Sequence, residues 1–65
     1  MFYLQVIRDE KITAQREFHS AGDCTEKLLL AFEYYVRKNE KVLIRMLDQR
    51  QMLIKELNSE KGLET

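Results

Sequence analysis

The two side chains most able to do chemistry are a single histidine and a single cysteine. His19 and Cys24 lie five residues apart in the chain. A nucleophilic cysteine–histidine pair needs hydrogen-bond contact and a third group that orients the histidine. With one residue of each kind, and a chain too short for a core with a pocket, we interpret the pair as incidental. We therefore expect no catalytic residue and a protein that is not an enzyme.

A cluster of cations is the second feature that could bind something. The segment 37–50 is the only basic part of the chain, whose formal net charge is zero. On a helix these cations would surround one aromatic ring, and such a face can follow a phosphate backbone or meet an acidic protein. A solvated helical face is the third interpretation, and the zero net charge favours it over nucleic-acid binding. The candidate partner-binding residues are Tyr34, Arg37, Lys38, Lys41 and Arg45.

The composition indicates one small domain, 1–65, without a disulfide or a metal site. A chain of 65 residues has a marginal core at best. One cysteine allows no intramolecular disulfide, and one histidine beside it makes no zinc ligand set, so we expect no cofactor. The sequence contains no run of about 18 apolar residues and no charged-then-apolar leader. We therefore expect a cytoplasmic protein that makes no contact with a membrane.

The longest regular pattern is an apolar stripe with helical spacing. Residues 23–61 contain no Pro and no Gly, and Gly22 and Gly62 bracket them. Asp23 is of a type that caps helix N-termini, and a glycine suits the position just after a helix. The sequence therefore predicts one long helix over 23–61. A turn near 38–40 that divides it into two helices is the alternative, but the stripe keeps its phase across those residues.

A helix of that length predicts self-association. It would be far longer than a small globule needs, and half of its stripe would lie in water unless another chain covered it. We therefore expect a homodimer formed along the stripe. Its two polar positions, Asn39 and Arg50, would set the register of the helices, or would lie where the stripe is locally uncovered. The predicted interface residues are Leu29, Phe32, Val36, Asn39, Leu43, Met46, Arg50, Leu53 and Leu57.

Residues 2–19 have the pattern of two strands. Phe2, Leu4 and Val6 alternate onto one face, and a second alternating stretch follows a polar turn. The sequence thus predicts a β-hairpin, although a short helix from Asp9 to Ser20 is the alternative. We expect an α+β fold in which an N-terminal β-hairpin packs on one long C-terminal amphipathic helix. The alternative for the whole chain is an all-α helical hairpin.

The order strand, polar turn, strand, Gly22-Asp23 and long amphipathic helix resembles many very short accessory proteins of bacteriophages and mobile elements. Some of those proteins inhibit host defence or host enzymes by binding them. The function expected from the residues is a non-enzymatic interaction or regulatory protein that self-associates and binds a macromolecular partner. The resemblance implies a small inhibitor of a host protein as one alternative. A nucleic-acid-binding regulator that uses the Arg37–Arg45 face is the other.

Overall fold

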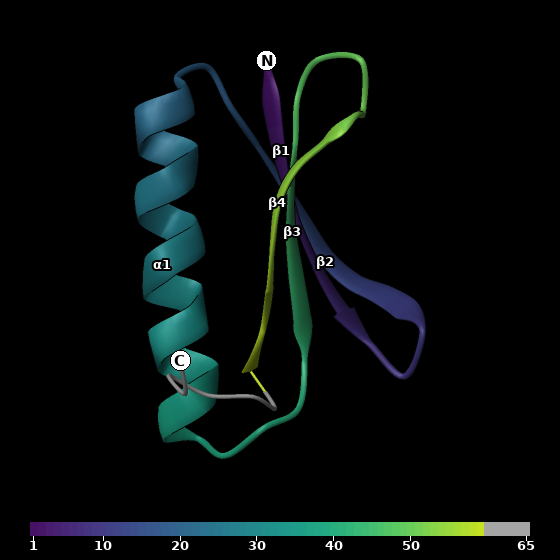
Figure 1. Cartoon of the computed structure of the whole chain (residues 1–65), viewed down its shortest axis with the longest axis vertical. Helices are drawn as coiled ribbons and strands as arrows, with labels where there is room; N and C mark the ends of the chain where they lie inside the picture. Colours follow the sequence, from purple (N-terminus) through teal and green to yellow (C-terminus); the bar gives the residue numbers. More distant parts are fainter. Residues whose placement is uncertain (60–65) are drawn as a thin grey trace.

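Two β-hairpins and the α-helix between them make up the part of the chain that the structure describes (Figure 1). The computed structural model describes residues 1–59. The four strands form one antiparallel sheet in the order β2-β1-β3-β4, and the helix lies against one face of it. The elements are β1 (Phe2–Arg8), β2 (Lys11–Phe18), α1 (Ala21–Arg37), β3 (Leu43–Leu47) and β4 (Leu53–Asn58).

The first hairpin forms where the alternating pattern predicted it. β1 and β2 pair along their whole length, from Phe2 opposite Phe18 to Arg8 opposite Lys11. The two residues of the turn, Asp9 and Glu10, have φ angles of 52° and 64°. Positive φ at both central positions characterises the type I′ turn, which matches the twist of a hairpin. This hairpin uses Asp and Glu where Asn-Gly is the usual choice, so the turn gave no clear signal in the sequence.

The N-cap of the helix lies three residues before the cap predicted at Asp23. Ser20 is the N-cap, and its Oγ accepts a hydrogen bond from the backbone N–H of Asp23 at 3.2 Å. Gly22 lies within the first turn of α1 instead of before it. The negative charge of Asp23 in this turn is favourable because backbone N–H groups point out of a helix N-terminus.

The helix ends at Arg37, so the predicted long helix over 23–61 is wrong. Asn39 has a φ of 59°, and its N–H donates to the carbonyl of Val36 at 3.1 Å. The N–H of Glu40 donates to the carbonyl of Tyr35 at 3.0 Å. These two bonds define a Schellman motif, in which Asn is the commonest replacement for Gly. Asn39 therefore stops the helix. The helix end predicted at Gly62 lies outside the described residues.

The chain after Asn39 forms a second hairpin where the sequence predicted helix. Ile44 lies off the helical stripe, yet it is fully buried on β3. In the β3–β4 turn, the carboxylate of Asp48 accepts hydrogen bonds from the N–H groups of Arg50 at 2.8 Å and Met52 at 2.9 Å. Gln51 has a φ of 62° in the same turn. The predicted dimer position Arg50 therefore belongs to an exposed turn.

The core lies between α1 and the two central strands. Cys24, Leu28 and Phe32 follow each other at intervals of four on the buried side of α1. They pack on alternate residues of β1 and β3, and burying a side chain such as Leu28 contributes about 1.5–3 kcal/mol. The buried cluster consists of Leu4, Val6, Cys24, Leu28, Phe32, Val42, Ile44 and Met46. Among the described residues, no helix is both long and apolar enough to cross a membrane.

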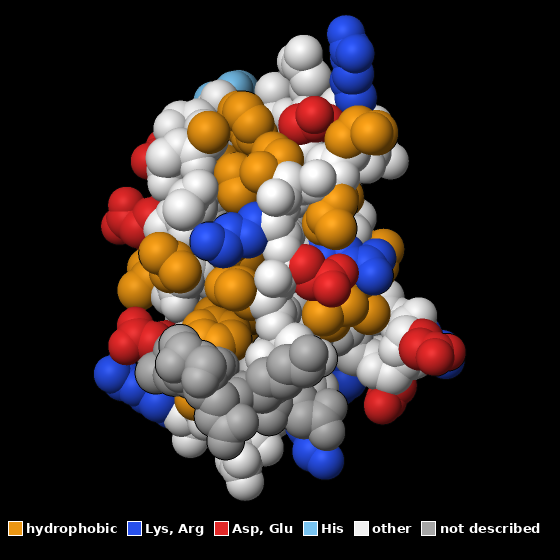
Figure 2. Space-filling view, in the orientation of Figure 1, with side chains coloured by type: hydrophobic (Ala, Val, Ile, Leu, Met, Phe, Trp, Pro, Cys, Tyr) orange, Lys and Arg blue, Asp and Glu red, His pale blue; other side chains and the backbone are white. Residues whose placement is uncertain are grey.

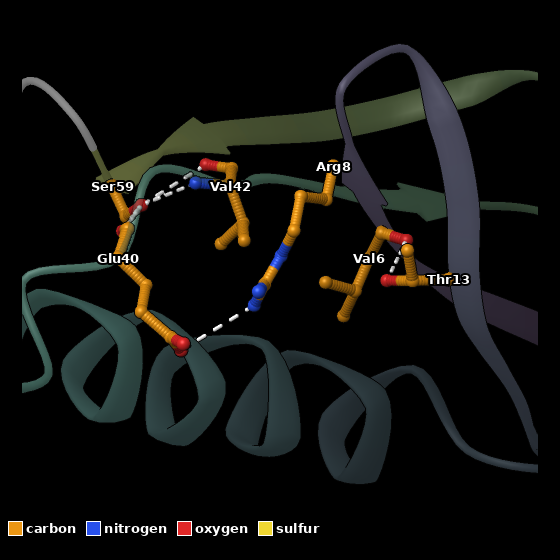
Figure 3. A network of polar contacts seen from close by, with 6 residues as sticks. All are labelled: Val6, Arg8, Thr13, Glu40, Val42 and Ser59. Carbon is orange, nitrogen blue, oxygen red and sulfur yellow. Dashed lines mark hydrogen bonds and ion pairs between the residues drawn. The ribbon is translucent and has the colours of Figure 1, made fainter.

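One buried hydroxyl joins the end of β4 to the connection between α1 and β3 (Figure 3). The Oγ of Ser59 accepts a hydrogen bond from the N–H of Val42 at 2.8 Å and donates to the carbonyl of Glu40 at 2.6 Å. The carboxylate of Glu40 lies 3.4 Å from the guanidinium of Arg8, at the end of β1. These contacts tie both central strands and β4 to the segment that follows the helix.

Candidate functional site

The histidine and the cysteine do not form a reactive pair in the structure. Cys24 is fully buried in the core, whereas His19 is exposed between β2 and α1. Burial raises the pKa of the Cys24 thiol, because the charged thiolate loses its hydration there. No group of three metal-ligating side chains occurs among the described residues.

The five predicted partner-binding residues are distributed over three parts of the fold. Tyr34 and Arg37 lie on α1, and Lys38 is its C-cap, with its ammonium 5.7 Å from the centre of the Tyr34 ring. Lys41 lies in the connection before β3, and Arg45 lies on β3 itself. The common helical face proposed for them does not exist, because the helix ends at Arg37.

Arg37 and Arg45 are each paired with a carboxylate of the same chain. The guanidinium of Arg37 lies 3.5 Å from the carboxylate of Glu33, one turn earlier on α1. The Nε of Arg45 donates to the carboxylate of Glu56 on β4 at 2.8 Å. Such pairs reduce the positive potential that a phosphate backbone would meet. The role of these five residues in binding a partner stays a prediction.

The nine predicted interface residues also separate in the folded chain. Phe32 and Met46 are buried in the protein's own core. Leu29 and Leu53 are about half exposed, on α1 and β4 respectively. Partly buried positions on α1, β3 and β4 make up a third group: Val36, Leu43 and Leu57. Asn39 and Arg50 occupy the helix end and the second turn. No continuous stripe remains, and a role for these residues in self-association stays a prediction.

The sheet has a second face that α1 does not cover, and we call it the open face, although Leu47 on it is only 9% exposed. Side chains alternate along a strand, so residues next to the buried Leu4, Val6 and Ile44 point away from α1. The strand register arranges them in three rows across the sheet. The first row is Ile12, Ile7, Leu43 and Asn58; the middle row is Gln15, Gln5, Arg45 and Glu56; the third row is Glu17, Tyr3, Leu47 and Leu53.

The middle row is polar and satisfied within the chain. The amide of Gln5 donates to Gln15 at 2.9 Å, and Arg45 pairs with Glu56. The rows on either side are mostly apolar. In Figure 2, hydrophobic side chains are exposed over the strands on the right of the view, beside both acidic and basic side chains. Apolar rows that flank an internally paired polar row leave this face suited to contact with protein.

A hollow of about 630 Å³ lies on the open face at the first row. Ile7, Ile12 and Leu43 supply its apolar lining. The hairpin turn adds the carboxylates of Asp9 and Glu10, and β3 with its approach adds the cations of Lys41 and Arg45. The hollow thus combines an apolar floor with acidic groups from one hairpin and basic groups from the other.

The open face could have been inferred from β1. Tyr3 and Ile7 alternate with Leu4 and Val6, so this strand is apolar on both faces. A strand with that pattern is typical of the middle of a sheet that has apolar residues on both faces.

Searches of family models, curated proteins and solved structures found no match to this chain.

Proposed function

We propose that this protein is a non-enzymatic interaction module that self-associates through the open face of its sheet and binds a further protein. The observation that supports this proposal most strongly is the open face itself. It presents apolar residues of all four strands, and Ile12 on it is 56% exposed. Covering such a face removes apolar surface from water, which stabilises the covered state by roughly 25 cal/mol per Å² of buried apolar area.

The charges around the hollow support a second copy as the covering partner. We infer a two-fold axis along the apolar floor, which brings the acidic turn of one copy, Asp9 and Glu10, onto Arg45 of the other, and the reverse. Isologous dimers need this kind of self-complementary patch. Arg45 can donate to a further carboxylate because a guanidinium carries five N–H donors. Glu56 accepts from one of them, at 2.8 Å.

The test is the molecular mass in solution by light scattering, from low micromolar to near-millimolar concentration. The Ile12→Glu variant places a charge in the first row, and we expect it to be monomeric where the parent is a dimer. Leu29→Glu is the matched control, since Leu29 is 50% exposed on α1, away from the sheet. It should keep the parent mass. Loss of the dimer in Leu29→Glu alone would favour a helical interface, and a parent that is monomeric throughout would exclude self-association.

Three finer statements belong to the same proposal. The location is cytoplasmic, as the sequence favours. The partner is a protein, because the basic residues do not gather into one stripe for a phosphate backbone. The resemblance to accessory proteins of bacteriophages implies that this partner belongs to a host, and that stays a prediction.

A further inference from the structure

A groove separates α1 from the first hairpin on the helix-bearing face of the sheet. It has a volume of about 290 Å³ and lies on the opposite side of the sheet from the open face. All residues of β2 except Phe18 are exposed, because α1 packs chiefly over β1 and β3. The apolar lining of the groove is Leu4, Val6, Ala14, Leu30, Ala31 and Tyr35.

The part of the sheet that α1 leaves uncovered is narrower than a helix, so a second helix seated in this groove would extend past the edge strand β2. Four strands at about 4.8 Å spacing make a sheet about 19 Å wide. One helix with its side chains is about 10–12 Å across. Ala14 on β2 and Ala31 on α1 have small side chains, so a backbone can approach closely between them.

The charges at the groove are all of one sign. Arg16 from β2 and Lys27 from α1 line it, and no carboxylate does. Neither cation forms an ion pair within the described part of the chain. Further along α1, Lys38 stands over the ring of Tyr34, which is 53% exposed. The groove therefore complements an apolar surface bordered by carboxylates.

We propose that this groove binds an acidic amphipathic helix of a partner protein. The apolar side of that helix lies on Ala14, Leu30 and Ala31, and its flanking carboxylates meet Arg16 and Lys27. An amphipathic helix presents anchors at i, i+3, i+4 and i+7, which is the arrangement that a groove between a helix and a sheet accepts. The inference rests on the proposed function, and it adds the class of partner that this second surface takes.

The probe is a labelled synthetic helix with leucine at the anchor positions and glutamate beside them. Its binding is followed by fluorescence anisotropy. We expect saturable binding that weakens about tenfold in the Arg16→Gln, Lys27→Gln double variant. The matched control is Lys55→Gln, because Lys55 pairs with Met46 and lies on the same face of the sheet, beyond the other side of α1. This control should bind like the parent.

A second peptide, with lysine in place of each glutamate, should not bind. Amide chemical shifts should move at Ala14 and Ala31, and not at the first row of the open face. Equal binding of both peptides, equal loss in Lys55→Gln, or shifts confined to the open face would overturn the inference, and so would absence of binding. Self-association is measured by the molecular mass and involves the opposite face of the sheet. A failure of that proposal is therefore distinguishable from a failure of peptide binding in the groove.

Discussion

Removal of the Ser59 hydroxyl should destabilise the protein far more than the loss of a single oxygen atom suggests. In Ser59→Ala, the N–H of Val42 loses the acceptor that lies 2.8 Å away, and the carbonyl of Glu40 loses its donor at 2.6 Å. Val42 is 3% exposed, so water cannot replace the acceptor without opening the structure. A buried donor left unsatisfied costs about 1–3 kcal/mol. We expect a loss of about 2–3 kcal/mol, against a total stability of roughly 3–10 kcal/mol for a domain of this size.

The measurement is urea unfolding followed by circular dichroism. With an m-value of about 1 kcal/mol/M, the midpoint should fall by about 2–3 M. Thr13→Val is the matched control (Figure 3), because Thr13 also donates a hydroxyl hydrogen to a carbonyl, that of Val6 at 3.2 Å. Thr13 is exposed, so water can take over, and the change should stay within about 0.5 kcal/mol. A Ser59→Ala midpoint no lower than that of the control would refute the role assigned to Ser59.

Three further predictions concern single positions. Asn39→Ala should lower stability by about 1 kcal/mol and Asn39→Gly should not, because the helix ends at a positive φ there; equal melting temperatures for the two variants would contradict this. Glu10→Gly should raise stability by about 0.5–1 kcal/mol, since glycine suits the type I′ turn, and a lower urea midpoint would argue against that turn. Burial raises the pKa of the Cys24 thiol above 9.0, so its contribution to stability is complete below pH 9.0 and is lost as the pH rises through the folded-state pKa. The Cys24→Ala variant should lack this part of the loss of stability at alkaline pH, measured as the urea midpoint against pH. If the variant loses stability over the same pH range as the parent, other groups cause the loss.

The first half of the fold was predictable because each pattern there fits one kind of element. Phe2, Leu4 and Val6 alternate with period two, and Cys24, Leu28 and Phe32 recur with helical spacing. The class, α+β, follows from these two elements together. Even the N-cap had a signal in Ser20, whose side chain is among the strongest capping groups.

The second half failed because short apolar runs fit both periods. Leu43, Met46 and Leu47 continue the helical stripe by chance, and a strand buried in the middle of a sheet shows the same density of apolar residues. Two local facts argued for strands: Ile44 had no place on the stripe, and Asn39 is well suited to end a helix. β1 alone indicated a second apolar face, but the rows of the open face could not be predicted, because they exist only once four strands are in register.

The central pairing of β1 with β3 has a consequence for how the chain folds. Each hairpin is local, but their union joins residues separated by the whole of β2 and α1, as in the pair Val6 and Ile44. Before that closure each hairpin has only α1 to pack on, and a lone two-stranded ribbon is not stable in water. The slow event in refolding should therefore be loop closure, with the entropy cost of a long chain segment, and it should appear as one exponential phase in stopped-flow experiments. Neither hairpin alone is then a folding unit, and we expect the molecule to fold in one cooperative step.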